Sequence, residues 1–197
     1  KELGGIEPGE KLNLAELRKS ARFQSLMRDY QRALASGKGE AELEKLEQMA
    51  APLAPAGFKF AEFKGQFQLQ RVFQDYYRAL TGKGSEAKAE ELAKKLEAME
   101  SRDAETLNEI SWTLLTDEKI KTRNLKLAMK FAQAAFDASG GKDANVLDTY
   151  ARALFDTGKV AEAVTQQKRA IELSDDQDKK SELEGNLKRY QAKAGAR

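Results

Sequence analysis

Apolar residues recur at intervals of three and four along most of the chain, the spacing that places them on one face of a helix. No run shows the strict alternation of a half-buried strand. The segments with helical spacing cover residues 14–30, 43–49, 60–80, 85–99, 107–114, 125–135, 146–154, 163–173 and 183–190. The pattern predicts an all-α protein of nine helices. Asn13 is the expected cap of the first helix, with Glu16 three residues later. Residues 1–12 are expected to form a flexible N-terminal segment.

Two kinds of internal repeat organise these helices. The stretch Asp29–Leu34 returns 46 residues later as Asp75–Leu80, and each copy is followed by Gly-Lys-Gly, which we expect to end the helix. In the C-terminal half, the spacing of Leu107, Ser111 and Leu114 returns in Leu147, Ala151 and Leu154. The chain is therefore expected to contain helical-hairpin repeats of one type over residues 13–102 and of a second type over residues 103–193, with the change near 101–103.

The second repeat type has the most specific spacing in the chain. Leu147–Leu154 is followed by Gly158, Ala163, Ala170 and Leu173. This segment resembles a tetratricopeptide repeat (TPR), except that Asp175 stands where the family usually has a proline. In the preceding copy the connection 116–124 is longer than usual. The resemblance implies a right-handed α-solenoid of about four helix hairpins with a C-terminal capping helix, and an inner groove that binds peptides.

A wider region is similar to a bacterial arrangement. The stretches Leu107–Leu115 and Asp143–Thr149 resemble the helical region that follows the thioredoxin-like domain in some exported redoxin-type proteins. This resemblance covers residues 103–192. It implies an accessory domain that dimerises, or that positions a redox domain of a larger protein. It also implies a periplasmic or other extracytoplasmic location, and leaves a cytoplasmic one open.

Composition removes most catalytic chemistry. The chain has no Cys and no His, so disulfides, thiol nucleophiles, serine–histidine catalysis and the common zinc and copper ligand sets are excluded. Carboxylate pairs such as Glu90/Glu91 are adjacent on one helix and do not face each other across a cleft. We therefore expect no enzyme activity, no cofactor and no metal.

Charge and hydropathy bear on partners. With 34 Lys and Arg against 32 Asp and Glu, the formal net charge is +2, too small to attract nucleic acid. A basic cluster lies among acidic neighbours; its members are Lys119, Lys121, Arg123, Lys126 and Lys130. We expect a solvated face there, with nucleic-acid binding as the rival interpretation. The longest apolar runs are a few residues, which predicts no membrane insertion.

The binding hypothesis rests on polar and aromatic residues of the two first helices in the TPR-like half. The candidate groove residues are Asn108, Trp112, Asn145, Thr149 and Arg152. Arg offers a charged fork, Asn a paired donor and acceptor, and Trp an aromatic anchor. Solvated surface is the alternative, and for Trp112 packing against the connection after Leu115. The predicted function is a non-catalytic scaffold for a protein or peptide partner.

One further feature leaves self-association open. Aromatic residues are dense between Phe58 and Tyr77. We expect them to form the core between repeat units, because aromatic side chains dominate apolar burial. The alternative is that part of the series is a ligand-facing or homodimer surface.

Overall fold

The computed structural model describes residues 14–82 and 84–195, and over these ranges the chain is helical and has no strand. The prediction of an all-α protein is confirmed for this part of the chain. The expected flexible segment 1–12, the expected cap Asn13 and Lys83 lie outside the described residues.

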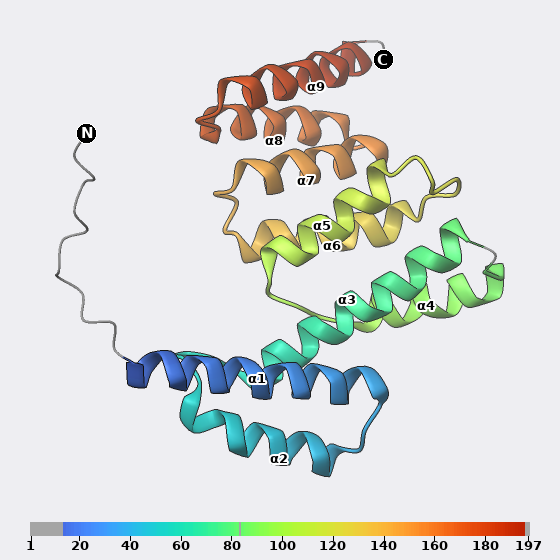
Figure 1. The fold of residues 1–197 in the computed structure, drawn as a ribbon. Helices are drawn as coiled ribbons and strands as arrows, with labels where there is room; N and C mark the ends of the chain where they lie inside the picture. The colour runs from blue at the N-terminus through green and yellow to red at the C-terminus, as the bar shows by residue number, and fades with distance from the viewer. Residues whose placement is uncertain (1–13, 83, 196–197) are drawn as a thin grey trace, which may run out of the picture. The chain divides into compact units, whose positions relative to one another are not determined.

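Nine α-helices and one short 3₁₀ helix make up the described ranges (Figure 1). Their bounds are α1 Leu14–Ser36, α2 Glu40–Ala50, η1 Ala51–Leu53, α3 Phe60–Thr81, α4 Glu86–Ala98, α5 Ala104–Thr116, α6 Leu125–Ala138, α7 Ala144–Asp156, α8 Val160–Leu173 and α9 Gln177–Gly195. The chain divides into two compact units, Lys1–Lys64 and Gly65–Arg197. The predicted change of repeat type near 101–103 lies inside the second unit and stays a prediction.

The first unit is built from α1, α2 and an aromatic cluster. Gly37 ends α1 in the left-handed conformation with φ +69°, and the Lys38 N–H donates to the Ala33 carbonyl over 3.1 Å. This turn brings α2 back against α1. Tyr30 is 1% exposed; its ring packs against Phe60 and Phe63, and its hydroxyl donates to Glu47 of α2. These contacts support the expectation that the aromatic series forms core here.

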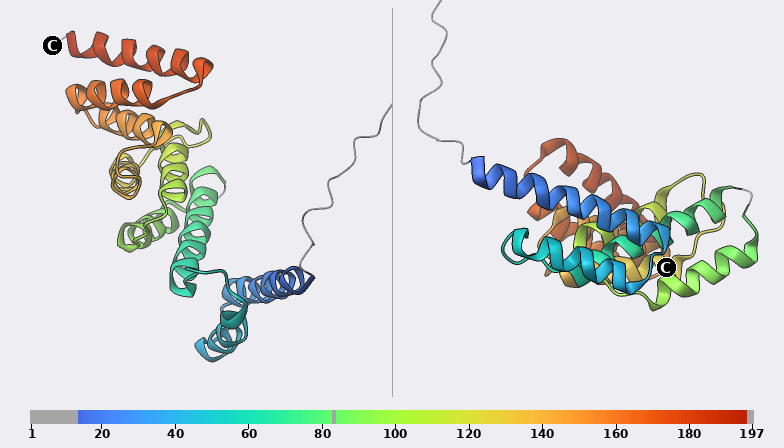
Figure 2. Two further views of the ribbon diagram at one scale, coloured as in Figure 1. Left: turned by 90° about the vertical axis from the view of Figure 1, so that its left-hand side faces the viewer. Right: turned by 60° about the horizontal axis from the view of Figure 1, so that its bottom comes forward.

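From α5 onward, each helix of the second unit packs on its successor. Helix α5 packs against α6 and α7, α6 against α7, α7 against α8, and α8 against α9. Figures 1 and 2 show α7, α8 and α9 as successive antiparallel layers. At the other end of the unit, α4 packs against α6, and α3 adds Leu69, Val72 and Tyr76 to the shared core.

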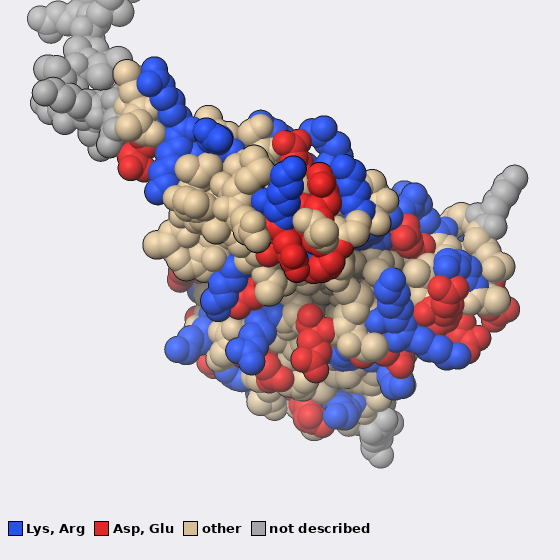
Figure 3. Space-filling view, turned by 90° about the horizontal axis from the view of Figure 1, so that it is seen from below, with Lys and Arg blue, Asp and Glu red and all other residues tan. Residues whose placement is uncertain are grey.

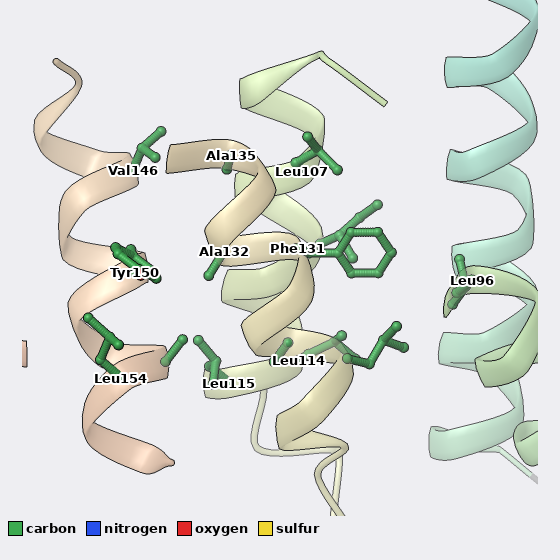
Figure 4. Close-up of a cluster of buried hydrophobic side chains, with 14 of the residues drawn as sticks. Leu96, Leu107, Leu114, Leu115, Phe131, Ala132, Ala135, Val146, Tyr150 and Leu154 are labelled. Atoms are coloured by element: carbon green, nitrogen blue, oxygen red, sulfur yellow. The ribbon is translucent and has the colours of Figure 1, made fainter. Parts of the chain in front are cut away.

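Small residues allow close approach in that core (Figure 4). Ala132 and Ala135 of α6 are fully buried between the larger side chains of α5 and α7. Phe131 of the same helix fills the space toward Leu96 of α4. Because alanine occupies the contact positions, helix axes can lie close while Leu, Phe and Tyr fill the spaces between them.

Charge is mixed on the surface. On the face shown in Figure 3, Lys and Arg lie beside Asp and Glu over the described residues. Many such pairs are local ion pairs, such as Asp29–Arg32 on α1 and Glu90–Lys94 on α4. This distribution follows from the near-zero net charge and the high content of charged residues.

Candidate functional site

The candidate groove residues lie on α5 and α7, which pack against each other. Both helices begin at an aspartate cap. The Asp103 carboxylate accepts the Thr106 N–H over 2.7 Å, and the Asp143 carboxylate accepts the Val146 N–H over 3.1 Å. These caps fix where each helix starts and so set which side chains share a face.

The five candidate residues differ in accessibility. Asn145 is exposed, and Asn108, Trp112 and Arg152 are half-buried. Thr149 is only 2% exposed, and its hydroxyl donates to the Asn145 carbonyl one turn earlier over 3.0 Å. In this structure Thr149 therefore presents almost no surface to a partner. The other four residues are each partly or fully accessible. Whether any of them binds a partner stays a prediction.

Two of these residues have specific local surroundings. The Arg152 Nε donates to Asp156 Oδ2 over 2.7 Å, and both side chains are mostly buried. The Asn108 Oδ1 atom is buried without a hydrogen-bond partner among the described residues. A buried, unpaired amide oxygen is costly to the fold.

Helix α9 supplies side chains beside the C-terminal end of α7 that sequence reasoning did not select. The rings of Phe155 and Tyr190 stack with centroids 4.4 Å apart, and the Arg189 guanidinium lies over both. Tyr190 is fully buried, and burial raises the pKa of its hydroxyl. The spacing of Leu183, Leu187 and Tyr190 puts them on one stripe of the last helix, but the sequence does not state which ring of α7 Tyr190 contacts.

A buried carboxylate joins α7, α8 and α9. Asp148 is 2% exposed; its Oδ1 atom accepts Gln167 Nε2 over 2.9 Å and Asn186 Nδ2 over 3.2 Å. The nearest cation is Lys179, 3.9 Å from Oδ2. Burial raises the pKa of Asp148, although these donors oppose the effect. Because α7 contributes Asp148, α8 contributes Gln167 and α9 contributes Lys179 and Asn186, this cluster fixes how α9 sits on the hairpin α7–α8.

Side chains of α3, of α5 and of Asp117, which follows α5, line an open pocket of about 370 Å³. Its lining residues are Phe73, Gln74, Tyr77, Arg78, Thr113 and Asp117. The Tyr77 hydroxyl donates to Asp117 Oδ2 over 2.8 Å. This bond raises the pKa of Tyr77, and the pKa of Asp117 is lowered, first by the Lys119 N–H and then by Tyr77. Phe73 and Tyr77 belong to the aromatic series that the sequence assigns mainly to the core.

Two members of the basic cluster are committed to the fold. The Arg123 guanidinium donates to the carbonyls of Leu114 and Asp117, and so fastens the long connection after α5. The Lys130 ammonium donates to the carbonyls of Glu97 and Met99 and so caps α4. Lys119, Lys121 and Lys126 remain exposed.

Neither a metal site nor a membrane span is present in the described part of the chain. Among those residues no three carboxylates gather closely enough to hold a metal ion. No helix within residues 14–82 and 84–195 is long and apolar enough to cross a bilayer.

Comparison with known proteins adds no identification. No family model, curated protein or solved structure matches this chain.

Proposed function

We propose that this protein is a non-catalytic scaffold that binds a peptide or protein segment along a groove formed by the first helices of a right-handed, TPR-like array. In this arrangement α5–α6 and α7–α8 are successive hairpins, and α9 is the capping helix. The groove is then lined by α3, α5, α7 and α9.

One observation carries the proposal: α5 packs both against α6 and against α7. In a closed up-down bundle of four helices the first helix also packs against the fourth, whereas α5 has no extensive contact with α8. In a stacked array, first helices contact each other and keep one face open. Asn145 is exposed, and Trp112 and Arg152 are half-buried on these helices, which fits an open face.

The chemistry of this face suits a polypeptide. Arg152 provides a guanidinium held in place by Asp156, and Asn145 provides an amide that can both donate to and accept from a main chain. Trp112 offers an aromatic surface, which commonly contributes much of the binding energy at protein interfaces. The absence of Cys and His removes thiol nucleophiles and imidazole bases.

The test is selection of peptides from a random phage-displayed library against the purified protein. Asn145→Arg combined with Arg152→Glu is expected to weaken binding of the selected peptides at least ten-fold. The matched control is Lys168→Glu, which reverses a charge at an exposed position of α8 and should leave binding unchanged. Thr149 is left unchanged because a carboxylate at this buried position would unfold the helix pair.

Two results would contradict the proposal. In the first, no peptide is selected above the background of an unrelated helical protein. In the second, the selected peptides bind the doubly substituted protein as well as the native one, while circular dichroism shows that the variant is folded.

A further inference from the structure

The first half of α1 extends beyond the helix that packs on its second half. Helix α1 has 23 residues and α2 has 11. The buried residues of α1 all lie between Leu26 and Leu34, and every residue from 14 to 22 is exposed. Figure 1 shows the start of α1 reaching past the end of α2. About two and a half turns of this helix are therefore accessible to a partner.

Two stripes run along opposite sides of α1. The core stripe contains Phe23, Met27 and Tyr30, and the Phe23 ring packs edge-on against Phe58 with centroids 5.2 Å apart. The opposite stripe also recurs at intervals of three and four residues, and all of its members are exposed; they are Leu14, Leu17, Arg18, Ala21, Ser25, Arg28 and Arg32. Its two leucines are 63% and 49% exposed, so they face away from the core of their own unit.

This outer stripe and its border are basic. Four exposed cations form no ion pair among the described residues, whereas Arg32 pairs with Asp29; the four are Arg18, Lys19, Arg22 and Arg28. Glu16 is the only acidic residue in the range 14–28, which therefore has a net charge of +3. Residues 1–13 contain two Lys and three Glu, so residues 1–28 together keep a net charge of +2.

The acidic helix α2 leaves this charge uncancelled. Its last glutamate, Glu47, accepts the Tyr30 hydroxyl, which places α2 beside the second half of α1. A third glutamate, Glu44, shares the helix with Lys45. The other two are paired with lysines of the same unit, as Glu40–Lys64 and Glu42–Lys38. The unpaired cations of α1 are thus concentrated on and beside the stripe that carries the exposed leucines.

Exposed leucines among unpaired cations fit the surface of an anionic lipid bilayer. Leucine side chains can enter the apolar boundary, while arginine side chains reach the lipid phosphates on long stems. Nucleic acid would use the cations and leave the leucines in water. A second copy of the chain would bring the same cations together, and two leucines provide far less than the ~800 Å² per partner of a stable interface.

We propose that the first unit binds reversibly to anionic lipid bilayers through the outer stripe of α1. Leu14 and Leu17 lie at the acyl boundary, and Arg18, Arg22 and Arg28 contact lipid phosphates. The helix lies along the surface and does not cross it. Because the core stripe is on the opposite side of α1, its contacts with the rest of the first unit are kept. The proposal is independent of the groove, whose residues all belong to the second unit.

The test is flotation of the full chain with lipid vesicles. Vesicles of equal parts phosphatidylcholine and phosphatidylglycerol are compared with vesicles of phosphatidylcholine alone. At low salt the partition coefficient is expected to be at least ten-fold higher for the anionic vesicles, and it should fall as salt is added, because the cations are exposed. Equal partition into the two kinds of vesicle, or none into the anionic ones, would overturn the proposal.

Charge reversal locates the contact. Arg18→Glu combined with Arg22→Glu is expected to weaken binding to anionic vesicles at least ten-fold. The matched control is Lys188→Glu combined with Lys193→Glu, which makes the same change in net charge at exposed positions of α9 and should leave binding unchanged. If both double variants lose binding equally, the vesicles respond to overall charge, and the assignment to α1 is wrong.

Removing the leucines distinguishes a bilayer from other polyanions. Leu14→Ser combined with Leu17→Ser should weaken binding at least five-fold without changing the helix content measured by circular dichroism, since both side chains are exposed. The control Leu173→Ser removes a leucine that is 45% exposed on α8 and should have no effect. If the leucine variant binds vesicles as tightly as the native chain, and single-stranded DNA displaces both from them, the stripe is a general polyanion site and the proposal is wrong.

Discussion

The two copies of the repeated stretch Asp-Tyr-x-Arg-Ala-Leu form the same local structure but enter different environments. In both, the tyrosine is buried, with Tyr30 1% and Tyr76 2% exposed. In both, the aspartate and the arginine three residues later form an ion pair. The Tyr30 hydroxyl, however, donates to Glu47 of the next helix, whereas the Tyr76 hydroxyl receives a hydrogen bond from Asn124, the cap residue of α6.

The helix that follows each copy explains this difference. The position equivalent to Glu47 in the second copy is Ala93, which is buried in the core of α3, α4 and their neighbours. At this position the second hairpin therefore offers Tyr76 no carboxylate. The first copy completes its contacts within a small unit, and the second uses its tyrosine to join a larger core. A repeated sequence thus specifies a helix and its buried ring, while the surrounding residues specify what the ring contacts.

The largest expected effect is loss of either ring. Tyr30→Ala and Tyr76→Ala should each lower the free energy of unfolding by about 3–5 kcal/mol, as for other large buried aromatics. Hydrogen exchange followed by mass spectrometry should locate the loss, in residues 14–64 for the first variant and in residues 65–195 for the second. Equal loss of protection in both regions from either variant would show that the two copies stabilise one common core.

Transplanting the missing acceptor should fail. If the copies were equivalent, Ala93→Glu would give Tyr76 the partner that Glu47 gives Tyr30. Because Ala93 is only 8% exposed, we expect the buried carboxylate to lower the free energy of unfolding by about 2–4 kcal/mol. Urea denaturation measures this change, with Ala93→Leu as a control of added size without charge. A more stable Glu variant would contradict the comparison.

Alkaline pH should weaken both environments. The pKa of each of the five tyrosines is raised from its ordinary value of 10.0, mainly by burial except at Tyr77, where the hydrogen bond that its hydroxyl donates to Asp117 is the largest cause. The folded protein therefore keeps phenolic protons that the unfolded chain loses near pH 10. The stabilisation is complete below pH 10 and decreases as the pH rises above it.

Absorbance at 295 nm follows the phenolates directly. In the folded protein the tyrosines should ionise at higher pH than in the urea-unfolded chain. Tyr30→Phe should remove the one phenol whose pKa is raised most. Coincident titration curves for the folded and unfolded chains would contradict this prediction.

The smallest effect is expected at the ion pairs that both copies share. Asp29→Ala and Asp75→Ala remove exposed i,i+3 pairs, so each should lower the free energy of unfolding by only about 0.2–0.5 kcal/mol. Equilibrium urea denaturation at low and high salt measures the change, which should shrink at high salt. A loss above about 1 kcal/mol at only one copy would mean that its aspartate has a further role.

Much of the helical architecture was predictable because it depends on local periodicity. The stripe of Leu107 and Leu114 and three alanines of α6 define buried faces by their spacing alone, and the structure buries them; these alanines are Ala128, Ala132 and Ala135. Gly37 was expected as a helix end and has the left-handed φ that this position requires. In the second copy Gly82 and Gly84 have no positive φ; a Cβ on either would lie within 3 Å of the backbone of α3. Their role is close approach, which no local pattern distinguishes from a turn.

The candidate site was less predictable because its members come together only through packing. Thr149 was chosen as non-core from its sequence position, yet it is buried, because neighbouring helices cover that side of α7. Asp148, a charged residue on the same helix, is buried because Gln167 and Asn186 provide donors from two other helices. The pocket joins α3 to α5 across about 40 residues of sequence, and helical periodicity contains no information on such pairs.

The position of the sole tryptophan has a practical consequence. Trp112 lies on α5 in the second unit, and the first unit has no indole. Intrinsic emission excited at 295 nm therefore reports on the second unit alone, while far-ultraviolet ellipticity sums the helices of both. Denaturation curves from the two signals will superimpose only if the units melt together, so the native chain, without any label, reveals whether its halves are thermodynamically independent.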